Sequence, residues 1–239
     1  MRDRTFLLAA ATVIAAWTWG CAGSEAPAPP AAESEPDRWE ETIQAFEARD
    51  KADPPPMGGV VFLGSSSIRL WDLDRWFPEL DAVNRGFGGS VIADSTRYAH
   101  RVLIPLEPRA IVFYAGDNDI ARGLSPEQVR DDFRDFARNV HGALPEARII
   151  FISIKPSLKR WEVVERMREA NRLIAAVAES DSRIEYLDVD AAMLGADGRP
   201  DPKYFQNDGL HLNDLGYELW TSLLHPLLAP YRTSPRTAK

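Results

Sequence analysis

Four short polar motifs in this chain contain residue types that together suit acyl transfer. The serines at residues 64–67 offer a nucleophile, and the turns at 88–90 and 116–119 offer hydrogen-bond donors for a developing negative charge. A late Asp-Gly-Leu-His motif at 208–211 supplies an imidazole that can take a serine proton and a carboxylate that can fix its tautomer. The four motifs in this order predict a serine nucleophile with a base and an oxyanion site.

Each motif also has an ordinary structural explanation when it is taken alone. Serines after a strand commonly cap the next helix, glycine turns are common, and asparagine often closes a turn through its own side chain. A single histidine is more often solvated or part of a core than catalytic. His100, His141 and His225 fall within predicted helices, so we interpret them as structural or solvated.

Buried parallel strands are predicted from continuous apolar runs. Residues 60–63, 110–114 and 149–154 are apolar on both faces, which is typical of strands covered on both sides. Residues 82–83 and 184–187 form weaker fourth and fifth strands. Each of the first three motifs lies after one of these strands, and the glycine turn belongs to the segment 84–90 that follows residues 82–83.

Helical patterns separate the predicted strands. Apolar residues recur at helical spacing over 39–49, over the segment that begins at Ser125-Pro126, over 161–179 and over 215–228. Alternating strands and helices predict an α/β domain with a parallel sheet, whose ligands bind at the carboxyl ends of the strands. No internal repeat and no second domain is evident.

The motifs resemble the four blocks of the SGNH hydrolases, also called the GDSL esterase/lipase family. The resemblance assigns the nucleophile to Ser66, the second-block glycine to Gly89 and the oxyanion amide to Asn118. It assigns the orienting carboxylate to Asp208 and the base to His211. The oxyanion hole would combine the backbone N–H groups of Ser66 and Gly89 with the Asn118 amide. The resemblance implies a flavodoxin-like three-layer α/β/α sandwich with a five-stranded parallel sheet.

One residue departs from the family pattern. Ser65 stands where the family commonly has aspartate, so three serines are adjacent, and we expect Ser65 and Ser67 to have capping or turn-bonding roles. Arg160 and Trp161 follow the fourth strand and are candidates to line the pocket, or else pack at a helix start. For the tryptophans at 71 and 76, helix packing is favoured over an aromatic wall of the site.

The resemblance implies a serine esterase that needs no cofactor and no metal. It covers short-chain acyl or acetyl esters, including O-acetylated carbohydrate, and the lack of a long apolar lid favours short acyl chains. The expected partner is a small-molecule or carbohydrate ester. Two alternatives remain: a non-catalytic carbohydrate-binding lipoprotein on a hydrolase scaffold, and a metal-dependent phosphoester hydrolase. The metal would bind Asp117, Asp119, Asp208 and His211.

The composition is that of an ordinary globular protein. The 239 residues are 45% hydrophobic and 27% charged, with a formal net charge of -8. This acidic balance without a basic run argues against nucleic acid as a partner. The single cysteine excludes an intramolecular disulfide.

The N-terminus predicts export. Arg2 and Arg4 precede an apolar run at 6–19, which is typical of a signal peptide. Gly20 and Cys21 resemble a bacterial lipobox, which implies lipidation of Cys21, a membrane lipid anchor and a place in the cell envelope. Ala22 favours the outer membrane by resemblance; ordinary secretion or a retained membrane anchor are the alternatives.

We therefore divide the chain into four parts. Residues 1–21 form the predicted signal peptide, and 22–38, rich in Ala, Pro, Glu and Ser, form a predicted disordered linker. Residues 39–232 form the hydrolase domain and 233–239 a loose tail.

Overall fold

The computed structural model describes residues 38–232. The predicted signal peptide, Cys21, the linker up to residue 37 and the tail at 233–239 lie outside this part of the chain. Within residues 38–232, no helix combines the length and the apolar character needed to cross a lipid bilayer.

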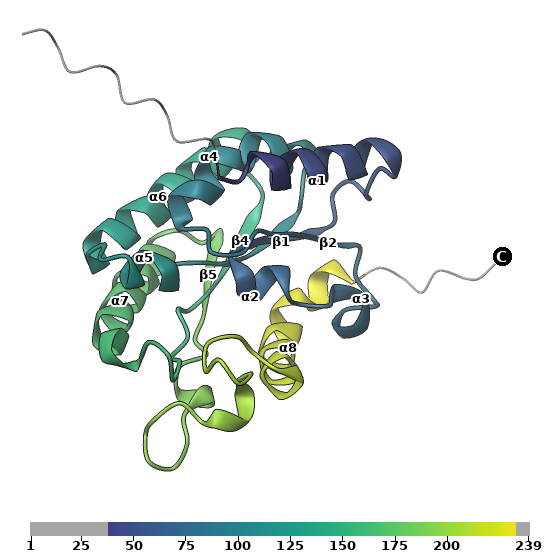
Figure 1. Cartoon of the computed structure of the whole chain (residues 1–239). Helices are drawn as coiled ribbons and strands as arrows, with labels where there is room; N and C mark the ends of the chain where they lie inside the picture. The colour runs from purple at the N-terminus through teal and green to yellow at the C-terminus, as the bar shows by residue number, and fades with distance from the viewer. Residues whose placement is uncertain (1–37, 233–239) are drawn as a thin grey trace, which may run out of the picture. The chain divides into compact units, whose positions relative to one another are not determined.

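Five strands of the described chain form one sheet in which all neighbouring strands are parallel (Figure 1). The strands are β1 (Val60–Gly64), β2 (Ala82–Gly86), β3 (Ala110–Tyr114), β4 (Arg148–Ile152) and β5 (Ile184–Leu187). Their spatial order is β2-β1-β3-β4-β5, which is the doubly wound order of flavodoxin-like folds. The predicted α/β fold class with a five-stranded parallel sheet is confirmed.

Side chains of the central strand β1 alternate between two apolar cores. Val61 and Leu63 belong to one core, and Val60 and Phe62 belong to the other, as the two-residue period of a strand requires. All residues of β1 and β3 are buried, because helices cover both faces of the sheet. The continuous apolar runs in the sequence have this origin.

Helices on both faces complete the three-layer sandwich. In the described residues they are α1 (Glu40–Ala52), α2 (Ser66–Arg69), α3 (Leu73–Trp76), α4 (Ile92–Val102), α5 (Asp117–Ala121), α6 (Pro126–Ala143), α7 (Val164–Ser180) and α8 (Asp214–Leu228). Short 3₁₀ helices are η1 (Ile104–Leu106), η2 (Trp161–Val163), η3 (Ala191–Met193), η4 (Pro202–Tyr204) and η5 (Ala229–Tyr231). Side chains of α1, α4, α6 and α7 fill one core, and those of α2, α3 and α8 fill the other. Figure 1 shows α1 and α4 above the sheet and α2 and α8 below it.

Strand β2 is longer than its sequence predicts, because two of its residues are polar. The prediction stopped at residue 83, whereas the strand continues through Asn84 and Arg85 to Gly86. The Arg85 side chain is buried, and its guanidinium bonds to the Asp50 carboxylate at 2.5 Å and to the Val102 carbonyl at 3.1 Å. These partners replace the water that an arginine loses on burial.

Two predicted helix starts have different outcomes. The helix predicted to begin at Ser125-Pro126 does so: Ser125 caps α6, since its Oγ accepts from the Gln128 N–H at 3.2 Å and its own N–H donates to Gln128 Oε1 at 2.9 Å. The helix predicted over 161–179 is divided into η2 and α7, which begins at Val164. Neither Arg160 nor Val163 provides a side-chain cap there, and a tighter 3₁₀ turn frequently precedes a helix.

Trp71 is a core residue. Its ring is 2% exposed and packs against Phe62, Phe77 and Trp220 at centroid distances of 5.5, 5.4 and 5.7 Å. Trp76 is half-buried against the same core. The favoured interpretation of helix packing is therefore confirmed for both tryptophans.

Asp119 links α5 to the start of α4 and predicts a pH-dependent stability. Its Oδ1 accepts from the Ile92 N–H at 3.0 Å, and its side chain is fully buried. Burial raises the pKa of Asp119 from 3.8 to about 6. A raised folded-state pKa gives stability that is present below pH 3.8 and is lost as the pH rises through about 6.

We therefore expect Asp119→Asn to gain stability relative to the wild type as the pH rises. The difference between their free energies of unfolding should change by about 2–3 kcal/mol between pH 4 and pH 8. Urea unfolding of both proteins at the two pH values measures this change. A difference that is the same at both would show that Asp119 does not titrate in this range.

Candidate active site

The turn after β1 places Ser66 at the carboxyl edge of the sheet. Gly64 has a φ of +143°, and a Cβ on it would lie 1.9 Å from the carbonyl oxygen of Tyr114. Glycine is therefore required at this position. Ser66 follows as the first residue of α2, where the backbone N–H groups have no partner within the helix.

The turn before α8 brings Asp208 and His211 together. Gly209 has a φ of +65°, and its carbonyl accepts from the Lys159 N–H at 3.0 Å. Asp208 Oδ1 accepts from the backbone N–H groups of Leu210 and His211 at 2.9 and 3.0 Å. Gly209 thus forms a turn that directs both functional side chains to one side.

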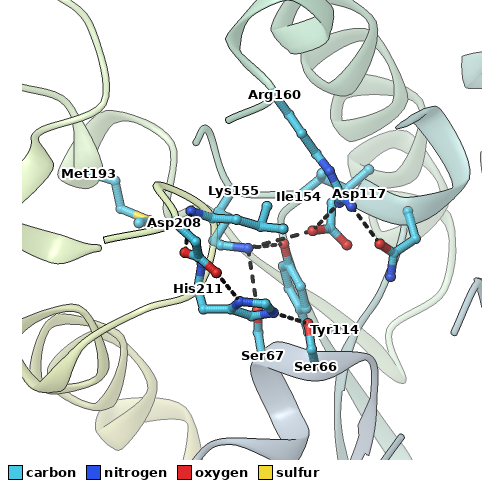
Figure 2. A network of polar contacts seen from close by, with 12 residues as sticks. Ser66, Ser67, Tyr114, Asp117, Ile154, Lys155, Arg160, Met193, Asp208 and His211 are labelled. Atoms are coloured by element: carbon cyan, nitrogen blue, oxygen red, sulfur yellow. Dashed lines mark hydrogen bonds and ion pairs between the residues drawn. The ribbon is translucent and has the colours of Figure 1, made fainter. Parts of the chain in front are cut away.

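His211 lies between Asp208 and Ser66 (Figure 2). The His211 Nε2 is 3.0 Å from Ser66 Oγ, and its Nδ1 is 2.5 Å from Asp208 Oδ2. Burial acts to raise the pKa of Asp208, but hydrogen bonds from two backbone N–H groups and from the imidazole outweigh it and lower the pKa to about 2. An ionised Asp208 holds the proton on Nδ1, which leaves Nε2 to accept the serine proton.

The three adjacent serines have different surroundings. Only the Ser66 hydroxyl contacts His211; the buried Ser67 Oγ accepts from Lys155 Nζ at 3.3 Å. Ser65 occupies the N-cap position of α2, but its buried Oγ has no hydrogen-bond partner in the described chain. The predicted capping or turn-bonding role is therefore wrong for the Ser65 hydroxyl, and Ser67 bonds to a distant lysine instead of to its own turn.

A cavity of about 510 Å³ joins the serine to both predicted oxyanion turns. Its lining residues are Trp39, Thr42, Ser66, Arg69, Gly88, Gly89, Asn118, Leu210 and His211. Gly89 has a φ of +81°, a left-handed conformation that glycine adopts freely. Asn118 Nδ2 donates to the Ser90 carbonyl at 3.0 Å. The fold thus brings all five predicted site residues to one place.

Comparison with known proteins agrees with this geometry. A model of the GDSL-like lipase/acylhydrolase family matches residues 69–219, which is more than half of the chain. The chain belongs to this family. The match begins just after Ser66 and includes Asn118, Asp208 and His211.

Individual relatives of this GDSL-like protein are distant but cover most of it. The human platelet-activating factor acetylhydrolase IB subunit alpha1 is 29% identical, over 80% of this chain and 83% of the human protein. A GDSL-like lipase from Bacteroides thetaiotaomicron has a TM-score of 0.67 and 20% identity, over 79% of this chain and 97% of that one. An acetylxylan esterase from Geobacillus stearothermophilus has a TM-score of 0.59 and 15% identity, over 72% and 94%. Family and relatives together show an ester-hydrolysing enzyme.

Buried charges adjoin the asparagine turn of this GDSL-like enzyme (Figure 2). Arg160 Nη2 donates to Asn118 Oδ1 at 2.7 Å, and its Nη1 lies 2.7 Å from Asp117 Oδ2. Lys155 Nζ lies 3.6 Å from the same carboxylate oxygen and donates to the Tyr114 hydroxyl at 3.1 Å. Arginine offers only donors, so the contact with Arg160 fixes the oxygen of the Asn118 amide and directs Nδ2 away from it.

Sequence reasoning missed Lys155. Its side chain is 1% exposed, and burial lowers its pKa. The signal was a lysine directly after the fourth apolar strand, where a polar group reaches the carboxyl edge of the sheet. Arg160, a candidate to line the pocket, does not line the serine cavity, but it contacts Asn118, which does. Trp161 does not line the serine cavity; its ring lies beneath the guanidinium groups of Arg168 and Arg199.

The described chain contains no cluster of potential metal ligands. No group of three or more potential ligands there is arranged to hold a metal ion. The carboxylates of the metal alternative are separately engaged, since Asp117 pairs with Arg160 and Asp119 accepts from Ile92. His141 is buried, and its Nε2 lies 3.1 Å from the Ala147 carbonyl oxygen. His100 is exposed. His225 is half-buried and packs against a phenylalanine ring.

Proposed function

We propose that this enzyme is a serine esterase that works through an acyl-enzyme intermediate on Ser66. The observation that carries the proposal is the 3.0 Å contact between Ser66 Oγ and His211 Nε2, at the wall of an open cavity. A serine is a weak nucleophile until an adjacent base removes its proton. His211 is in position to do so, and Asp208 stabilises the imidazolium that forms.

The reaction follows from these contacts. Ser66 Oγ attacks the ester carbonyl as its proton passes to His211 Nε2, and the carbonyl oxygen becomes an oxyanion. The C–O bond to the alcohol then breaks, and His211 returns the proton to the leaving oxygen. Water attacks the acyl-enzyme by the same route, giving the carboxylic acid and free Ser66.

Three donors are available for the oxyanion. The backbone N–H of Ser66 lies at the start of α2, and the backbone N–H of Gly89 lies in the glycine turn on the same cavity. The Asn118 amide has two N–H groups, of which one donates to Ser90. The other can donate to the oxyanion. Such fixed donors usually supply the largest part of the rate enhancement in acyl transfer.

The substrates we propose are short-chain acyl or acetyl esters, including O-acetylated carbohydrate. Two relatives support this choice, because the human protein is named as an acetylhydrolase and the Geobacillus protein as an acetylxylan esterase. The test is a panel of 4-nitrophenyl acetate, butanoate and octanoate together with acetylated xylan. Highest kcat/KM for acetate is expected. A clear preference for octanoate would overturn the short-chain assignment.

A fluorophosphonate probe tests the nucleophile directly. It should modify Ser66 alone, which peptide mass spectrometry can distinguish from Ser65 and Ser67. A purified, folded protein that takes no label would support a non-catalytic binding role on this scaffold.

We also propose that the enzyme is a lipoprotein of the bacterial envelope, anchored through Cys21 and favouring the outer membrane. The support is the apolar segment at 6–19 followed by Gly20 and Cys21. An alkyne fatty acid fed to expressing cells should label the wild type, and Cys21→Ser should lose both the label and sedimentation with membranes. Release of unlabelled wild-type protein into the medium would indicate ordinary secretion instead.

Arg160 is a positioning residue in this proposal. Replacing it with methionine frees the Asn118 amide to rotate. We expect kcat to fall about tenfold, which corresponds to the free energy of one charge-assisted hydrogen bond. Asn118→Ala should lower kcat by about 100–1000-fold. Because Arg160 acts through Asn118, Arg160→Met should have little further effect in the Asn118→Ala background. Fully multiplicative losses in this double-mutant cycle would contradict the role.

A further inference from the structure

The cavity at Ser66 is lined by one guanidinium, that of Arg69, and by the His211 imidazole, and no carboxylate lines it among the described residues. This is unusual in a chain with a formal net charge of -8. Three other surface cavities of the described chain each have carboxylates in their lining, at Asp181, at Glu107 and Glu146, and at Asp188 and Asp190. Each of those three cavities also has at least one arginine in its lining, so the cavity at Ser66 is distinguished from them by the lack of a lining carboxylate.

Arg69 is the basic residue nearest in sequence to the nucleophile. It is the last residue of α2, three positions after Ser66, and side chains with this spacing share one face of a helix. Its guanidinium packs over Gly88, where a Cβ would lie 2.8 Å from Arg69 Nε. Glycine at 88 thus makes room for the arginine beside the oxyanion turn.

Arg69 is exposed and lines the cavity. Its guanidinium has no ion pair within the described part of the chain. Several other arginines of this protein have carboxylate partners, such as Arg101 with Glu40 and Glu47. A guanidinium that faces a substrate cavity without a carboxylate keeps its donors available for a ligand anion.

Two more guanidinium groups surround the same glycine turn. Arg38 Nη2 would lie 3.0 Å from a Cβ on Gly89, and its guanidinium stacks at 4.4 Å from the centre of the Trp39 ring. Arg122 Nη2 donates to the Gly89 carbonyl at 2.7 Å. Three positive charges near one turn favour a negatively charged ligand in the adjoining cavity.

We propose that Arg69, assisted by Arg38, forms an anion subsite for esters whose alcohol portion carries a carboxylate or phosphate group. The inference rests on the proposed esterase function, because it concerns the substrate of that site. A short acyl group ends within one or two carbons of the carbonyl, so an anionic group that reaches Arg69 belongs to the alcohol. The planar guanidinium can bind either anion through two parallel hydrogen bonds.

The test compares two acetates that differ in one charge. The anionic 4-acetoxybenzoate and its neutral methyl ester are hydrolysed by the wild type, by Arg69→Gln and by Arg69→Lys at low ionic strength. The ratio of kcat/KM for the anionic over the neutral ester should fall about tenfold in Arg69→Gln and less in Arg69→Lys, since a lysine keeps the charge but loses the paired donors. Added salt should lower the wild-type ratio. A second pair, 4-acetoxyphenyl phosphate and its dimethyl ester, examines the phosphate in the same way.

The ratio separates charge recognition from a general loss of order at the site, which would slow both esters. Arg134→Gln removes a charge from an exposed position on α6 and should leave the ratio unchanged. An Arg69→Gln ratio equal to that of the wild type for both pairs would overturn the subsite. Turnover of the neutral acetate and fluorophosphonate labelling of Ser66 would then still support the esterase, whereas loss of both in the wild type would overturn the esterase itself.

Discussion

Ser66→Ala is expected to lower kcat for 4-nitrophenyl acetate by about 10⁵–10⁶-fold, close to the background of the uncatalysed reaction. The substitution removes the attacking oxygen, and within the described chain the Ser66 hydroxyl contacts only the His211 imidazole. The fold should therefore be unaffected. Turnover of the ester measures activity, circular dichroism measures whether the fold is kept, and fluorophosphonate labelling of the same preparation measures whether a reactive serine remains.

Ser65→Ala is the matched control for this experiment. It removes an identical hydroxyl one residue earlier, and that hydroxyl has no partner in the described chain. We expect it to keep kcat within about threefold of the wild type, because no hydrogen bond is lost. Wild-type turnover in Ser66→Ala, or its loss in Ser65→Ala alone, would show that the nucleophile is assigned to the wrong serine.

Asp208→Asn should lower kcat by about 10³–10⁴-fold through the tautomer of His211. The asparagine oxygen can still accept from the backbone N–H groups of Leu210 and His211, so the turn should persist. The amide nitrogen, however, would donate to Nδ1 and move the imidazole proton to Nε2. A protonated Nε2 cannot accept the proton of Ser66, as an equivalent substitution in serine proteases illustrates.

Asp201→Asn provides a control for the loss of one negative charge near the same segment, since Asp201 pairs with Lys203 and does not line the serine cavity. It should keep wild-type turnover. The pH profile adds a second readout. Because the pKa of Asp208 is lowered to about 2, its titration should cause no decrease in wild-type kcat above about pH 3. If Asp208→Asn had wild-type turnover, Asp208 would have no role in orienting His211.

The site and its environment depend on contacts between distant parts of the chain. Ser66 and His211 are 145 positions apart, and Arg160 and Asn118 are 42 positions apart. Ser66 and Asn118 follow β1 and β3 at one edge of the sheet, and the longer segments after β4 and β5 bring Arg160 and His211 to that edge. Arg69 needs no such assembly, since it follows the nucleophile by one helical turn, yet its place against Gly88 also depends on the pairing of β1 with β2.

Much of the framework could be predicted from the sequence, because its signals are local. Strands β1 and β3 are buried on both faces, so their segments had to be continuously apolar. The polar motifs directly after strands, and the late Asp-Gly-Leu-His turn, marked the edge where a site forms. The predicted strand at 82–83 is shorter than β2, because the strand continues through a buried arginine. The burial of Arg85 depends on Asp50, 35 positions earlier, which no local pattern reveals.

The amino-acid sequence by itself determined the approximate places of the strands, the order of the motifs and the set of residues able to carry out acyl transfer, but not the full length of β2. Only the tertiary structure decided which of three adjacent hydroxyls meets His211, which amide atom of Asn118 faces Arg160, and that Lys155 is buried between Ser67 and Tyr114. The physical reason is that hydrogen bonds are directional and short. Their partners are set by strand register and helix packing, and these are properties of the whole chain.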